Sequence, residues 1–220
     1  MRFGFALPQV GSAVGPEALV TVAKRAEDLG FDSLWVLDRI LWPANPRAPY
    51  PIDELIKALK TIWTTDPVEF QGKYYRIPKS FIGPKPVQKP HPPIYMAAYA
   101  PSALERVATE ANGWLPVGIP LSGGVGPMFD GIKSIAKNAG RDPSAIELIV
   151  GANVEIHNAP IEKDRVDFNG TLEQIAEDVT TARKLGEAEI VINAQFSPGV
   201  ETAKDLVARM EEFWRVAKGA

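Results

Sequence analysis

The sequence contains no cysteine among its 220 residues, which excludes disulfide bonds, thiolate metal sites and cysteine nucleophiles together. Histidine is nearly as scarce, since only His91 and His157 are present, and a histidine-rich metal site is not expected. No run approaches the ~20 apolar residues that a membrane-spanning helix requires. The apolar start of the chain is interrupted at Pro8, so we expect no signal peptide and a soluble, cytoplasmic protein.

Strong charge of either sign is also missing. The 24 basic and 27 acidic residues give a formal net charge of −3, and no basic run occurs. A mildly acidic chain of this kind is a poor candidate for binding nucleic acid or an anionic membrane. With 45% hydrophobic and 23% charged residues, the composition is that of a globular protein with a sizeable core. We expect a single domain over residues 1–220.

Hydrophobic patterns along the chain alternate between short apolar runs, typical of buried strands, and helical spacing. Strands are predicted at residues 2–7, 33–37, 94–99 and 114–117, within 146–156, and at 189–194. Helices are predicted at residues 16–29, 52–64, 102–112, 127–139, 171–185 and 199–217. Repeated strand–helix units imply a parallel sheet with helices outside it.

The segment at about residues 66–93 interrupts this alternation. Residues 68–77 have strand character and turn near Gln71-Gly72, which predicts a β-hairpin. Five prolines follow between residues 84 and 93. We therefore expect a hairpin and a proline-rich insertion within the one domain.

Two α/β architectures fit the alternation, a TIM-type (β/α) barrel and an open doubly wound sheet. No G-x-G-x-x-G follows the first strand, which disfavours a dinucleotide-binding open sheet. Six parallel strands are predicted, whereas a closed barrel has eight strands and typically ~250 residues. The sequence thus predicts a TIM-barrel-like fold that is incomplete by about two units.

Four stretches, in this order and spacing, suggest a family. They are residues 3–8 with 26–38, residues 59–63 with 67–75, residues 83–88 with 90–94, and residues 111–114 with 170–176. Through them nearly the whole chain resembles the bacterial luciferase-like oxidoreductases. The resemblance implies a (β/α)8 barrel and either flavin mononucleotide (FMN) or the deazaflavin coenzyme F420 as the cofactor.

The sequence departs from the family pattern at two places. Family members usually have two more strand–helix units after the second strand, whereas here Tyr50-Pro51 runs directly into the helix predicted from Ile52. The second departure is Asp38-Arg39, where many members have Asp-His. A role for that histidine at the flavin therefore does not transfer to Arg39.

The C-terminal ends of barrel strands form the ligand site, and three segments of this chain are predicted to lie there. Asp38 and Arg39 either line the flavin or substrate pocket, with Arg39 offering a charged fork to an anion, or form an ion pair on the rim. Trp42 either walls the pocket or is an exposed loop aromatic. Trp114 fits the core better than a stack on the flavin ring. The candidate cofactor-binding residues are Asp38, Arg39, Ala98, Tyr99, Ala100, Pro101, Ser102, Gly113 and Trp114.

The turn that leads into the helix predicted from Ser102 is the best phosphate candidate. Small residues precede it, and a helix N-terminus presents free N–H groups and positive dipole charge to an anion. The family resemblance places the cofactor phosphate at this turn. The alternative is structural, because Ser102 and Glu105 have the spacing of a capping box.

The remaining polar features favour structural roles. Asn193 and Gln195, near the end of the last strand, either reach the pocket or make ordinary hydrogen bonds on the rim. Residues 171–174 form a second capping-box pattern. No catalytic residue is assigned.

Under the resemblance, the chain is an oxidoreductase that uses coenzyme F420 for hydride transfer, or FMN for monooxygenation, on a small organic substrate. The cofactor then carries the redox chemistry and the protein positions it. The alternative is a non-catalytic flavin-binding or degenerate member that lost activity with the missing units, and a third interpretation is a structural fragment that holds no cofactor. Two missing strands expose parallel sheet edges, which predicts a homodimer.

Overall fold

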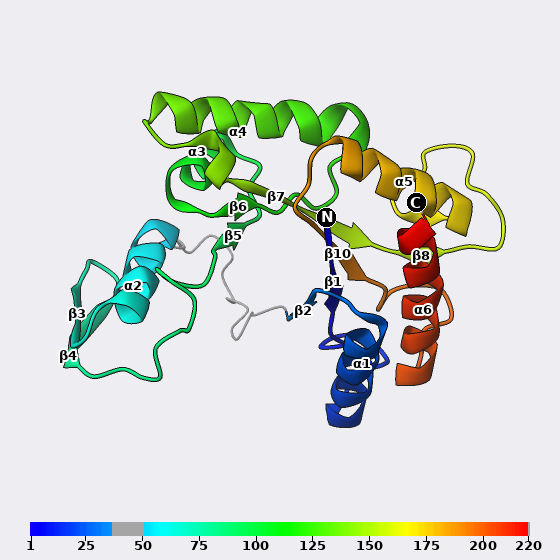
Figure 1. Ribbon diagram of the computed structural model, residues 1–220, viewed down its shortest axis with the longest axis horizontal. Helices are drawn as coiled ribbons and strands as arrows, with labels where there is room; N and C mark the ends of the chain where they lie inside the picture. The colour runs from blue at the N-terminus through cyan, green and yellow to red at the C-terminus, as the bar shows by residue number, and fades with distance from the viewer. Residues whose placement is uncertain (37–50, 220) are drawn as a thin grey trace.

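The computed structural model describes residues 1–36 and 51–219. Six strands form one sheet in the order β2-β1-β10-β7-β6-β5, and every neighbouring pair is parallel. The sheet curls into a half-barrel (Figure 1). The predicted six-stranded, incomplete α/β barrel is thus confirmed. The strands are β1 (Arg2–Ala6), β2 (Ser33–Trp35), β5 (Tyr95–Met96), β6 (Gly113–Trp114), β7 (Glu147–Asn153) and β10 (Glu189–Asn193).

All six predicted helices are present, and α2 has the predicted bounds. Among the residues that the structure describes, none of the helices has the length and apolar character needed to cross a membrane. The helices are α1 (Pro16–Leu29), α2 (Ile52–Thr64), α3 (Pro101–Glu110), α4 (Gly126–Asn138), α5 (Leu172–Lys184) and α6 (Ala203–Gly219). Shorter elements are η1 (Leu121–Val125), η2 (Pro143–Ala145), β8 (Glu155–Ile156) and β9 (Asn169–Gly170).

Several boundaries differ from the sequence-based expectation for identifiable reasons. The strand predicted at 114–117 ends at Trp114: Leu115 still donates to the Met96 carbonyl at 2.9 Å, but Pro116 has no N–H with which to continue the ladder. The last helix begins at Ala203 rather than 199, because the Asp205 carboxylate binds the N–H and hydroxyl of Thr202 and fixes the helix start there.

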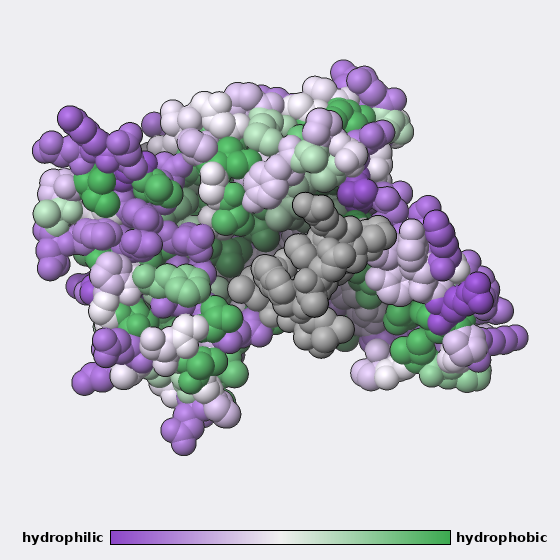
Figure 2. All heavy atoms as spheres, turned by 180° about the vertical axis from the view of Figure 1, so that it is seen from behind, coloured by the Kyte–Doolittle hydropathy of each residue, from purple (hydrophilic) through white to green (hydrophobic). Residues whose placement is uncertain are grey.

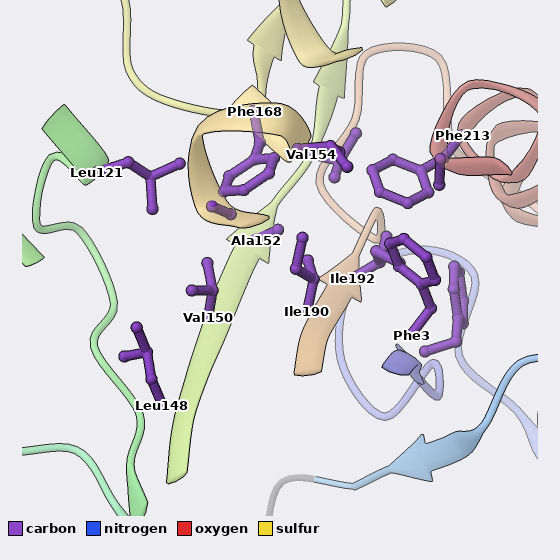
Figure 3. Packing of buried hydrophobic residues seen from close by; sticks show 14 of the residues in the cluster. Phe3, Leu121, Leu148, Val150, Ala152, Val154, Phe168, Ile190, Ile192 and Phe213 are labelled. Atoms are coloured by element: carbon purple, nitrogen blue, oxygen red, sulfur yellow. The ribbon is translucent and has the colours of Figure 1, made fainter. Parts of the chain in front are cut away.

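The hydrophobic core lies between the sheet and its helices. Alternate strand residues point to opposite faces, so Phe3 and Phe5 of β1 and Ile190 and Ile192 of β10 share one face and are buried there. Phe213 of α6 packs against Phe3, edge to face, with 6.3 Å between ring centroids. Figure 3 shows Phe3, Ile190, Ile192 and Phe213 meeting beside the side chains of β7. We call this the helix-covered face of the sheet.

Helix α2 and the hairpin of β3 (Val68–Gln71) and β4 (Arg76–Ser80) form an arm beside this core. The Glu54 carboxylate on α2 accepts hydrogen bonds from the backbone N–H groups of Lys73, Tyr74 and Tyr75 at 2.6–3.0 Å. Although desolvation opposes it, these donors hold the pKa of Glu54 below its usual value. From behind, the arm projects to the right and its surface mixes hydrophilic and hydrophobic residues (Figure 2).

Candidate functional site

The six parallel strands end at the same edge of the sheet, so the loops that follow them gather there. These loops include the turn between β5 and α3, the loop from β6 to α4, and the connection from β7 to α5. The C-terminal edge is where barrel enzymes place their ligands. The side chains and backbone groups of each loop determine which kind of ligand that loop could bind.

The turn between β5 and α3 is open to solvent. Tyr99 is 51% exposed, and Ala100, Pro101 and Ser102 are exposed as well. Helix α3 begins at Pro101 with Ala100 at its N-cap, and no side chain caps it. The capping box expected at Ser102 is therefore wrong, because proline favours the first helical position and the helix starts one residue earlier.

The missing cap leaves a hydrogen-bond donor available. Ala103 and Leu104 both donate to the Ala100 carbonyl at 2.9 Å, and Pro101 has no N–H. The Ser102 N–H has no acceptor among the residues that the structure describes. It therefore points out of the positive end of α3 with its hydrogen-bonding capacity unused.

Three hydrogen bonds tie this turn to the end of β6 and the residues that follow it. The Trp114 indole N–H donates to the Ala98 carbonyl at 3.0 Å. The Tyr99 hydroxyl donates to the Val117 carbonyl at 2.9 Å and accepts from the Val117 N–H at 3.3 Å. Ala98 is buried. The backbone of the turn is thus held in place before any ligand arrives.

Ser102 also borders a surface hollow of about 320 Å³ between α2 and α3, together with Lys57 and Arg106. Arg106 is already paired with Asp53 through two hydrogen bonds, and this contact raises the pKa of Arg106 and lowers that of Asp53. Lys57 is exposed and forms no ion pair with a described residue.

Close packing at the end of β6 explains why Gly113 and Trp114 are a glycine and a tryptophan. A Cβ on Gly113 would lie 2.5 Å from the Glu147 carbonyl and 2.8 Å from the Tyr95 ring, so only glycine fits. Trp114 is fully buried and stacks on Phe129 of α4 at 6.4 Å between centroids. Its indole faces the helix layer, so Trp114 belongs to the core and we leave it out of the cofactor site. Asp38, Arg39 and Trp42 lie outside the described residues.

The other polar candidates make hydrogen bonds within the protein. Asn193 donates to the Asn153 side chain at 3.1 Å and accepts from the Gln195 side chain at 3.0 Å, while Gln195 also accepts from the Val10 N–H. His91 lies 2.7 Å from the Pro92 carbonyl, and His157 lies 3.6 Å from Glu155. The predicted capping box of Thr171 and Gln174 is confirmed.

A polar network lies on the face of the sheet opposite the helices, which we call the open face. Glu189, only 3% exposed, accepts hydrogen bonds from the Ser33 hydroxyl, from the Trp35 indole at 2.8 Å and from Arg2 at 3.3 Å. Arg2 also pairs with Glu147, which accepts from the Tyr95 hydroxyl at 2.5 Å. Five strands contribute to this network.

The network also brings the two edges of the sheet together. Trp35 of the edge strand β2 lies 5.8 Å, ring centroid to centroid, from Tyr95 of the opposite edge strand β5. Burial, and then the bond to Glu147, raise the pKa of Tyr95 to about 12. Side chains of β2 and β5 therefore bridge the curled sheet, although these two edge strands are not paired with each other in the described part of the chain.

A cleft of about 390 Å³ lies between the loop after β6 and the connection after β7. In Figure 3 the Leu121 side chain points toward Phe168, and Val150 of β7 lies below them in the view. Sequence reasoning missed this cleft; the only signal was a loop with four glycines between residues 118 and 126. None of the predicted cofactor-binding residues that the structure describes lines it. Its lining comprises Pro116, Gly118, Ile119, Pro120, Leu121, Val125, Val150, Gly151, Asn153, Glu155, Arg165, Val166, Asp167, Phe168 and Asn169.

Comparison with known families decides the relationship of the chain. Residues 44–215, well over half of the sequence, match the model of the luciferase-like monooxygenases. The chain belongs to the luciferase-like monooxygenase family. The resemblance found in the four sequence stretches is thereby confirmed.

Solved structures share the fold of this luciferase-like chain at low sequence identity. The coenzyme F420-dependent tetrahydromethanopterin reductase of Methanopyrus kandleri matches with a TM-score of 0.69 and 16% identity, over 96% of this chain and 99% of that chain. The monooxygenase RslO1 of Streptomyces bottropensis also matches with a TM-score of 0.69, at 14% identity over 100% and 99% of the two chains.

Curated relatives match the luciferase-like chain over shorter stretches. The FMNH2-dependent dimethylsulfone monooxygenase of Pseudomonas putida is 39% identical over 62 residues, which cover 28% of this chain and 17% of the relative. The oxygenase component of the flavin-dependent trigonelline monooxygenase of Acinetobacter baylyi is 38% identical over 64 residues, or 16% of its length. The matched stretches thus span about a sixth of these relatives.

Proposed function

We propose that this luciferase-like chain is an oxidoreductase that binds coenzyme F420 or FMN at the C-terminal edge of its sheet. The cofactor would supply hydride transfer in the first case and monooxygenation in the second, on a small organic substrate. Family membership and the cofactors named for its relatives support the proposal. The observation that carries it in this chain is the uncapped, solvent-open start of α3 beside the end of β5.

The residues of this turn fit a phosphate group. The unused Ser102 N–H, the Ser102 hydroxyl and the positive end of the α3 dipole would bind phosphate oxygens. Ala98 and Ala100 add no bulk, and the Tyr99 hydroxyl bonds to Val117 keep the turn in shape before binding. We keep Asp38 and Arg39, which close the second strand in sequence, as proposed neighbours of the flavin ring or substrate. Gly113 contributes by allowing the Tyr95 ring and the Glu147 backbone to pack closely against β6.

A comparison of FMN with riboflavin tests the phosphate site, because the two differ only in the phosphate. Charge-assisted hydrogen bonds contribute about 1.5–3 kcal/mol, so FMN should bind roughly 10- to 150-fold more tightly than riboflavin. Ser102→Asp places a negative charge at the site and should abolish this preference. Ser134→Asp, on an exposed position of α4, is the matched control and should keep it. Equal binding of FMN and riboflavin by the unmodified protein, measured by flavin fluorescence, would contradict the phosphate site.

A non-catalytic flavin-binding protein is the second candidate. The observation that favours it is the described sheet itself, in which β2 and β5 are both edges and no strand of the described residues closes the barrel. Turnover separates the two candidates. Saturable cofactor binding with consumption of reduced F420 or reduced FMN, dependent on an added substrate, supports the enzyme. Saturable binding with no such consumption over a broad substrate panel supports the carrier.

We further propose that the chain forms a homodimer through its sheet edges. Edge strands carry unpaired backbone N–H and C=O groups that a second copy can bind, and symmetric dimers are the commonest oligomers. The Trp35–Tyr95 contact bridges one end of the gap between the edges. Light scattering over a hundredfold concentration range should give the mass of a dimer. A mass of 23.9 kDa at every concentration would exclude it.

A further inference from the structure

The cleft between the loop after β6 and the connection after β7 has a chemistry of its own. Its volume of about 390 Å³ lies within the ~300–1,000 Å³ range of small-molecule sites. We propose that this cleft binds a small organic cation, with its ammonium group beside Glu155 and Asp167 and its apolar body against Ile119 and Val166. This proposal goes beyond the proposed oxidoreductase function, and the binding claim does not need the cofactor.

The charges around the cleft favour a cation. Glu155 and Asp167 line it, and the one guanidinium in the lining, Arg165, is engaged by Asp178 through two hydrogen bonds of 2.6 and 2.7 Å. Asp178 is only 4% exposed, so this pair is fixed. Three carboxylates thus face one guanidinium, and the surplus charge is negative. His157 adds positive charge beside Glu155 only when it is protonated. An anion would be repelled at this position.

The carboxylate of Asp167 is held in place but keeps an oxygen free. One oxygen accepts a hydrogen bond from the Leu121 N–H at 2.7 Å, across the cleft from its own loop. The other oxygen accepts no hydrogen bond from a described residue. Glu155 is partly exposed and begins β8, two residues after the end of β7. Both groups can therefore approach a ligand in the cleft without losing a partner.

The walls suit the apolar part of such a ligand. Ile119, which is partly exposed, and Val166, which is 60% exposed, offer apolar surface in the lining. Leu121, Val125 and Phe168 also line the cleft but are buried in the core, so they hold its shape. Phe168 holds a left-handed backbone conformation, φ +65°, and its N–H donates to Asp178 at 2.7 Å. The Asp178 carboxylate therefore fixes both Arg165 and the backbone at Phe168, next to Asp167.

Three benzene derivatives of similar size and different charge test the charge preference in the cofactor-free protein. Benzylammonium is the cation, benzyl alcohol the neutral analogue and benzoate the anion. Because two carboxylates line the cleft, calorimetric titration at low salt should give binding of the cation roughly tenfold or more tighter than the alcohol, and no measurable binding of benzoate. Cation binding should weaken as salt rises. Equal or tighter binding of the alcohol or of benzoate, or no binding of any probe, overturns the proposal.

Charge-neutralising variants locate the site. Glu155→Gln and Asp167→Asn should each weaken cation binding severalfold, and the Asn side chain keeps an acceptor for the Leu121 N–H. Glu162→Gln removes the same charge from an exposed position of the same connection that does not line the cleft, and it should leave binding unchanged. Thermal unfolding checks that each variant folds. If Glu162→Gln weakens binding as much as Glu155→Gln, the cation binds elsewhere. Because no cofactor is present, failure here leaves the FMN-against-riboflavin result untouched.

Discussion

The two faces of the one parallel sheet are built from the same strands but held by different forces. On the helix-covered face Phe3, Phe5 and Ile190 are buried among aliphatic and aromatic side chains. On the open face Arg2 and Glu189, which directly precede Phe3 and Ile190, belong to a hydrogen-bonded network. Because side chains alternate along a strand, one register places Phe3 and Ile190 on the helix-covered face and Arg2 and Glu189 on the open face, where the buried Ile149 lies beside Glu189.

This difference between the two faces assigns the stability of the fold to one face and the curvature of the sheet to the other. Burial of apolar area is the larger and less directional force, so the helix-covered face should dominate the free energy of unfolding. Hydrogen bonds between charged groups depend on geometry, and those on the open face connect residues from five strands. They fix how far the sheet curls and bring Trp35 to Tyr95.

The largest expected effect is on the helix-covered face. Ile190 is fully buried in the middle strands of the sheet, so Ile190→Ala removes packed atoms and leaves a cavity. We expect a loss of about 2–5 kcal/mol in the free energy of unfolding. Val20→Ala, at a 53% exposed position of α1, should change it by less than ~0.5 kcal/mol. Urea denaturation of both variants measures this. A loss at Ile190 no greater than at Val20 would contradict the assignment of stability to this face.

The open face should respond to added volume. A Cβ on Gly4 would lie 2.5 Å from the Glu189 carboxylate, 2.5 Å from the Ser33 hydroxyl and 2.7 Å from the Trp35 indole nitrogen. Gly4→Ala therefore has to displace the network, and we expect a loss of about 1–3 kcal/mol together with a change in Trp35 fluorescence.

Gly131→Ala is the matched control for this substitution. Nothing lies within 4 Å of a Cβ at Gly131 in α4, and alanine is the better helix former, so this variant should gain about 0.5–1 kcal/mol. Two variants of equal stability would show that the open-face network tolerates a methyl group.

The smallest expected effect concerns a buried carboxylate outside the network. Glu187, two residues before Glu189, is buried with both oxygens unpaired, and desolvation raises its pKa above the usual 4.5. Glu187→Met removes this unpaired charge and should stabilise the fold by about 1 kcal/mol at pH 7.

The pH dependence of the Glu187 effect follows from the direction of the pKa shift. The favourable, protonated form of Glu187 is fully present below pH 4.5, and its contribution is lost as the pH rises through the folded-state pKa. The advantage of Glu187→Met should therefore shrink as the pH falls toward 4.5, which thermal unfolding at several pH values measures. If the stability gain from Glu187→Met does not change with pH, it comes from better packing of the Met side chain and not from removal of the charge.

The sequence predicted the elements that depend on local pattern. The helical spacing of Leu55, Ile56, Leu59 and Ile62 is typical of an amphipathic helix, and the predicted bounds of α2 agree with the structure. The open-face network was not predictable, because Glu189 meets Ser33 and Arg2 only through the strand order of the folded sheet. The cap at α3 was mispredicted because Ser102 carries the capping pattern while Pro101 sets the helix start.

The site was predictable only in part for the same reason. The turn from Ala98 to Ser102 is continuous in sequence, so its place at a strand end followed from the strand–helix pattern. The cleft is made of two loops separated by about thirty residues, joined where Asp167 accepts from Leu121. No local pattern indicates that contact, so the cleft emerged only from the folded chain.

The hydrogen bond from the Trp114 indole to the Ala98 carbonyl couples the interior to the exposed turn. A screen that scores loss of flavin affinity would flag Trp114 alongside Ser102, although the indole touches no ligand. Trp114→Phe distinguishes a loss of core packing from a loss of the hydrogen bond to the turn. The variant keeps an aromatic ring against Phe129 and removes only the hydrogen bond to the Ala98 carbonyl. A buried residue that only positions a binding surface can thus lower ligand affinity on substitution as much as a residue that contacts the ligand.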